Sequence, residues 1–69
     1  MNRSMAAAAR RQIAELEARV TQQGAVVEGL VASNRDANAA TRMLRALESA
    51  LALTKQHLQS VLPREATSA

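Results

Sequence analysis

The sequence predicts an all-α protein, an antiparallel helical hairpin that dimerises into a four-helix bundle. Three observations support this fold. Apolar residues recur at alternating spacings of three and four in two separate stretches, as in a coiled coil. A short polar segment from Ser33 to Asp36 separates the two stretches. Alanine, the best helix former, is abundant throughout the chain.

The first helix is predicted over about residues 5–33, after a flexible N-terminus at 1–5. The spacing of its apolar residues puts them on one face of the helix, and Gln23 is the one polar residue in this stripe. These seam positions are Ala6, Ala9, Ile13, Leu16, Val20, Gln23, Val27 and Leu30.

The segment Ser33–Asp36 predicts the turn. Asn34 tolerates the left-handed conformation that ends many helices. Asp36 is a good N-cap residue, because its carboxylate can accept hydrogen bonds from the free N–H groups of the next helix.

The second helix is predicted over about residues 37–62. Pro63 should end it, because the residue before a proline is disfavoured in the helical region. Residues 63–69 are expected to be a disordered tail, so the hairpin covers residues 6–62. The seam of this helix is formed by Ala37, Ala40, Leu44, Leu47, Leu51, Thr54, Leu58 and Val61.

Folding the chain at residues 34–36 brings large seam residues opposite one another in most layers. Two polar residues, Gln23 and Thr54, also occupy seam positions. Either they fix the register and the oligomeric state, or they are exposed at imperfect layers. The predicted pairs are Leu30 with Ala40, Val27 with Leu44, Val20 with Leu51, and Ile13 with Leu58.

The second helix carries a further stripe beside its seam, with the same three-four spacing. Small residues let two helices approach closely, so this stripe predicts an interface with a second copy of the same helix. The alternative is a generally alanine-rich composition, which does not explain Met43 and Leu53. The predicted interface consists of Ala39, Met43, Ala46, Ala50, Leu53 and His57.

Composition excludes several classes of site. The 69 residues include no Cys and no aromatic residue, so disulfides, thiolate metal sites and base-stacking platforms are ruled out. A chain of this size needs additional stabilisation, and oligomerisation is the expected source. His57 is the only histidine; it is either an ordinary packed or partly exposed residue or a pH-sensitive contact at an interface. We therefore expect no enzyme, no metal and no cofactor.

The net charge is +3, and arginines gather near the N-terminus and near the turn. They either form solvated faces or contact phosphate. The residues that would contact nucleic acid are Arg3, Arg10, Arg11, Arg35, Arg42 and Arg45.

The segments Gln22–Leu30, Ala39–Ala40 and Leu44–Glu48, with Asp36 and Leu51, give residues 10–62 a likeness to a known group. The chain resembles short bacterial two-helix hairpin proteins of the alphaproteobacterial type. Members often have Gly near the turn, where this chain has Asn34. The resemblance implies a fold and no mechanism.

These features predict a non-catalytic, homo-oligomeric module, structural or regulatory, with a dimer favoured and a protein as its further partner. The alternative is a small basic hairpin that binds nucleic acid. No apolar run approaches the roughly 20 residues of a membrane span, and no signal peptide is recognisable. We therefore expect no membrane partner and a cytoplasmic location.

Overall fold

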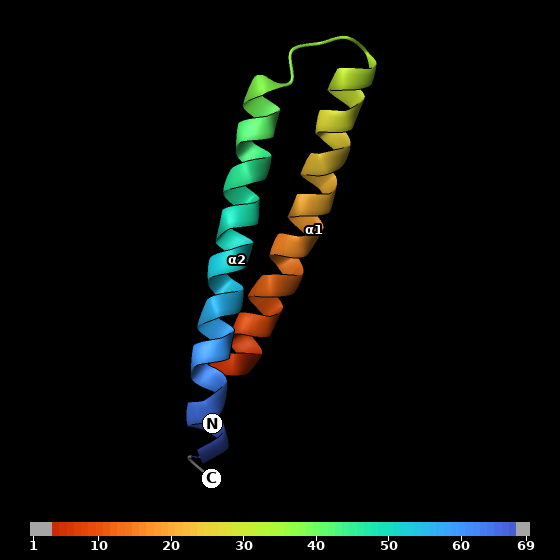
Figure 1. The fold of residues 1–69 in the computed structure, drawn as a ribbon. Helices are drawn as coiled ribbons and strands as arrows, with labels where there is room; N and C mark the ends of the chain where they lie inside the picture. The colour runs from red at the N-terminus through yellow and green to blue at the C-terminus, as the bar shows by residue number, and fades with distance from the viewer. Residues whose placement is uncertain (1–3, 68–69) are drawn as a thin grey trace.

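The computed structural model describes the backbone of residues 4–67 and the side chains of residues 4–64. Two helices, α1 (Met5–Ala32) and α2 (Asn38–Thr67), pack antiparallel against each other (Figure 1). They form a rod of 55 × 18 × 13 Å, in which the start of α1 and the end of α2 lie at the same end. No strand occurs within residues 4–67. The predicted antiparallel helical hairpin is confirmed.

A side-chain cap begins α1. Ser4 is the N-cap residue, and its Oγ accepts a hydrogen bond from the backbone N–H of Ala7 at 3.1 Å. This bond satisfies one of the free N–H groups of the first turn. The first helix thus begins at residue 5, as predicted, and Ser4, which falls within the predicted flexible N-terminus, caps it. Residues 1–3 lie outside the described part of the chain.

The end of α1 follows the Schellman pattern. The N–H of Arg35 donates to the carbonyl of Leu30 at 2.8 Å, and the N–H of Asn34 donates to Val31 at 3.0 Å. Asn34 has a φ of 60°, the left-handed conformation predicted for it. The Ser33 hydroxyl adds a hydrogen bond to the carbonyl of Gly29 at 2.8 Å. The turn is thus closed by hydrogen bonds within its own segment of the chain.

Asp36 makes the capping contact expected at the start of α2. Its Oδ1 accepts a hydrogen bond from the backbone N–H of Asn38 at 2.9 Å. The first helical hydrogen bond runs from the N–H of Thr41 to the carbonyl of Ala37 at 2.8 Å. The helix begins at Asn38, one residue later than predicted.

The prediction that Pro63 ends the second helix is wrong, because α2 continues through it to Thr67. A proline inside a helix has no N–H to donate to the carbonyl four residues earlier, here that of Gln59, and its ring crowds that carbonyl. The residues after Pro63 can still donate to the preceding turn. Arg64 also lies in the last turn, where a cation interacts favourably with the helix dipole. The predicted disordered tail therefore does not begin at residue 63; residues 68–69 lie outside the described part.

The seam lies where the two heptad series predict it. Every seam position of both helices is buried or half-buried, whereas most positions outside the seam are exposed. The alternation of three and four therefore identifies the packed face of each helix correctly.

This seam is nevertheless a thin core. Among the described residues only Ala6, Ala9 and Val61 are buried, with 2%, 3% and 2% of their surface exposed. The two helices approach each other most closely toward this end of the rod (Figure 1). Small side chains permit that approach, and no large apolar side chain is fully buried elsewhere in the described part. The leucines of the seam are half-buried, since each helix covers only one side of them.

Candidate interaction surface

The seam has two long edges, and one of them carries an ion pair between the helices. The Nζ atom of Lys55 lies 3.8 Å from Oε2 of Glu17, and both side chains are more than half exposed. We call this side the ion-pair edge. Its positions flanking the seam are Arg10, Glu17, Gly24 and Val31 on α1 and Thr41, Glu48, Lys55 and Leu62 on α2.

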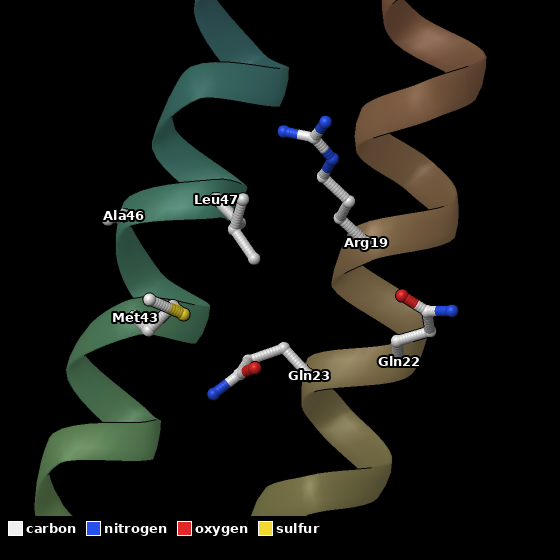
Figure 2. Close-up of a pocket in the computed structure, with 6 residues that line it drawn as sticks. All are labelled: Arg19, Gln22, Gln23, Met43, Ala46 and Leu47. Carbon is white, nitrogen blue, oxygen red and sulfur yellow. The ribbon is translucent and has the colours of Figure 1, made fainter.

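The other side, which we call the groove edge, is hollowed. A groove of about 410 Å³ lies between the helices near the middle of the rod. Arg19 and Gln23 extend from α1 into the space between the helices, Leu47 extends into it from α2, and Met43 lies over its own helix (Figure 2). Its lining combines one cation and two amides with three apolar side chains. The residues are Arg19, Gln22, Gln23, Met43, Ala46 and Leu47.

One hydrogen bond crosses the seam beside this groove. Nε2 of Gln23 donates to the backbone carbonyl of Ala40 at 3.0 Å. Thr54, the other polar seam residue, bonds within its own helix, to the carbonyl of Ala50 at 2.8 Å. Both are half-buried, so the interpretation that they are exposed at imperfect layers is wrong. Only Gln23 makes a contact that depends on the register of the two helices.

The predicted interface stripe lies along α2 on the groove edge. Its two largest apolar side chains, Met43 and Leu53, are 58% and 65% exposed. Ala50 is half-buried, and Ala39, Ala46 and His57 are exposed. Met43 and Ala46 also line the groove, which places the stripe and the groove on one continuous surface. The sequence analysis did not identify Arg19 and Gln22 as part of this surface, because both residues are polar and belong to no apolar repeat on α1.

The residue types that commonly bind metal ions, here His, Asp and Glu, do not gather anywhere in the described part. No group of three or more His, Asp or Glu side chains is arranged there to hold a metal ion. His57 lies exposed on α2.

The described basic residues proposed for nucleic-acid contact form two groups in different parts of the rod. Arg10 and Arg11 are in the first turns of α1, whereas Arg35, Arg42 and Arg45 lie at and after the turn. All five are exposed. Arg3 lies outside the described residues. The structure therefore does not join these cations into one patch.

Within the described residues, neither helix contains a stretch that is both long and apolar enough to cross a membrane.

Comparison with models of protein families, with characterised proteins and with solved structures finds no match to this chain. The resemblance to bacterial two-helix hairpin proteins therefore gains no support from these comparisons, and the functional argument depends on the surface itself.

Proposed function

We propose that this protein is a non-catalytic, self-associating helical module, in which two hairpins pair through the stripe on α2 into a four-helix bundle. The observation that carries the proposal is the exposure of Met43 and Leu53, more than half of each side chain, on a hairpin whose described part buries only two alanines and one valine. A structural or regulatory role in the cytoplasm, with the outer faces of the bundle open to a protein partner, completes the proposal.

The thin core supports pairing because a lone hairpin leaves its seam half open to water. Burial of a leucine or valine side chain contributes roughly 1.5–3 kcal/mol when it is complete. The half-buried leucines of α2 obtain only part of this contribution from α1. A second hairpin against the groove edge would add the remainder, without disulfides or metals.

The stripe is self-complementary under a two-fold axis near Ala46 and Ala50. An antiparallel copy of α2 would bring Met43 opposite Leu53 and Ala39 opposite His57. Small residues would lie at the crossing point and large ones on either side of it. The helix axes would then approach to about 8 Å, the near end of the usual range.

Sedimentation equilibrium tests this proposal on the wild type and on two charge variants. We expect a dimeric wild type. Ala50→Glu should give monomers or an unfolded chain, because it brings two like charges together in a buried site. Arg11→Glu, in an exposed position away from the stripe, should leave the dimer intact. A monomeric wild type would refute the proposal, and an Ala50→Glu protein that still dimerises would place the interface elsewhere.

The geometry gives less support to the alternative, a nucleic-acid-binding hairpin. Phosphate contacts need cations arranged along one face, whereas the two described arginine groups lie in different parts of the rod. The chain also has no aromatic side chain for base stacking.

A further inference from the structure

The groove between α1 and α2 is part of the molecule that the proposed stripe on α2 does not explain. The stripe alone requires contact between two copies of α2. The groove, however, is bordered as much by α1, through Arg19, Gln22 and Gln23, as by α2. Any partner lying over Met43 and Ala46 also lies over the groove.

The position of the groove along the rod coincides with the expected two-fold axis. An axis between Ala46 and Ala50 passes α2 near Leu47 and Glu48. Figure 2 shows Leu47 at about the level of Arg19, whereas Gln23 lies nearer the turn, at about the level of Met43. A two-fold axis at the level of Leu47 therefore crosses α1 near Arg19. This level lies within the groove, so a symmetric partner must cross both helices there.

The size and charge of the groove edge also suit a second copy. Seen flat, the hairpin is 55 Å long and 18 Å wide. Such a face can supply the roughly 800 Å² that each partner of a standard interface buries. The lining of the groove contains one charged residue, Arg19, whereas four charged residues flank the seam on the ion-pair edge, Arg10, Glu17, Glu48 and Lys55. A second copy against the groove edge therefore buries fewer charges.

We infer that a second copy of this chain occupies the groove, so that Arg19, Gln22 and Gln23 of α1 belong to the same interface as Met43 and Ala46. The inference rests on the proposed self-association and specifies its geometry. The two hairpins stack face to face, with α1 crossing its own copy near Arg19. Interface contacts are then shared between both helices instead of being confined to α2.

Single-cysteine cross-linking tests this geometry, because the natural chain contains no cysteine. Gln22→Cys and Thr21→Cys place the thiol on adjacent residues of α1, both within one turn of the axis. Both side chains are exposed, but Gln22 borders the groove and Thr21 turns toward the ion-pair edge. With a short bifunctional maleimide, Gln22→Cys should form a covalent dimer, whereas Thr21→Cys should remain largely uncross-linked. Circular dichroism and sedimentation equilibrium establish that each variant is helical and dimeric before the reagent is added.

The outcomes separate this inference from the proposed function. If Thr21→Cys cross-links and Gln22→Cys does not, the ion-pair edge forms the dimer and the inference is overturned. If neither cross-links although both variants are dimeric, α1 is outside the interface, which also overturns the inference while self-association stands. A monomeric wild type would instead remove the proposed function itself. Comparable cross-linking of both variants would mean contact without the expected geometry and would count against the inference.

Discussion

Both long edges of the seam combine charged and apolar side chains, but they differ in whether the charges pair across the two helices. On the ion-pair edge, Glu17 and Lys55 close over the seam from opposite helices. On the groove edge, Arg19 has no acidic residue opposite it in the lining, and the seam stays open as a groove of about 410 Å³. A hairpin can therefore cover one side of a thin core with its own charges. The other side is left for a partner.

Leu53 and Val31 allow the strongest test of this comparison, because they are equally exposed on opposite edges. Their exposed fractions are 65% and 63%. Leu53→Gln should weaken dimerisation by about 3 kcal/mol or more, roughly a hundredfold in Kd, since a dimer buries two leucines. Val31→Gln should leave Kd within about twofold, because surface substitutions usually change little. Sedimentation equilibrium measures both. Equal effects of the two substitutions would mean that the edges do not differ in function.

Gln23 and Thr54 allow a comparison of intermediate size. Gln23→Ala removes the hydrogen bond to the carbonyl of Ala40 across the seam, and should lower the free energy of unfolding by about 1 kcal/mol. Thr54→Ala removes a bond within one helix and replaces a β-branched residue with a better helix former, so it should be close to neutral. Urea unfolding, followed by circular dichroism at one protein concentration, measures both changes. A larger loss for Thr54→Ala would contradict the assignment of the register contact to Gln23.

The smallest effect is expected for the ion pair itself. A double-mutant cycle of Glu17→Ala and Lys55→Ala should give a coupling free energy of no more than about 0.5 kcal/mol, because both side chains are more than half exposed. The coupling should decrease further in high salt, since mobile ions screen exposed charges. Thermal unfolding at low and high salt provides the measurement. A coupling above about 1 kcal/mol, insensitive to salt, would show that this edge is buried in the assembly.

Local and periodic features of the fold could be predicted from the sequence. The seam positions, the left-handed Asn34 and the capping contact of Asp36 each follow from one helix or one turn considered alone. The prediction at Pro63 failed because a proline near the end of a helix removes one hydrogen bond without preventing the next turn. The N-cap at Ser4 was missed because Ala7, three residues later, lacks the acidic partner of a capping box.

The candidate site was predictable only in part, for a physical reason. The stripe on α2 is a property of one helix, and its spacing reveals it. The groove is a property of two helices together, because its lining depends on the register that brings Arg19 to the level of Leu47 and Gln23 to the level of Met43. Arg19 and Gln22 carry no apolar pattern, so only the packed pair shows that they border the same hollow as Met43.

The turn has a consequence for the speed of folding. Its hydrogen bonds join residues no more than five positions apart, from Leu30 to Arg35 and from Asp36 to Asn38. The reversal of the chain can therefore form before the helices meet, and little loop-closure entropy remains to oppose their pairing. Contacts of α1 with α2 then form outward from residues 33–37, as in other helical proteins of low contact order that fold in microseconds to milliseconds. At micromolar concentration the hairpin should fold faster than two hairpins associate. Bimolecular association is therefore expected to be the rate-limiting step of assembly.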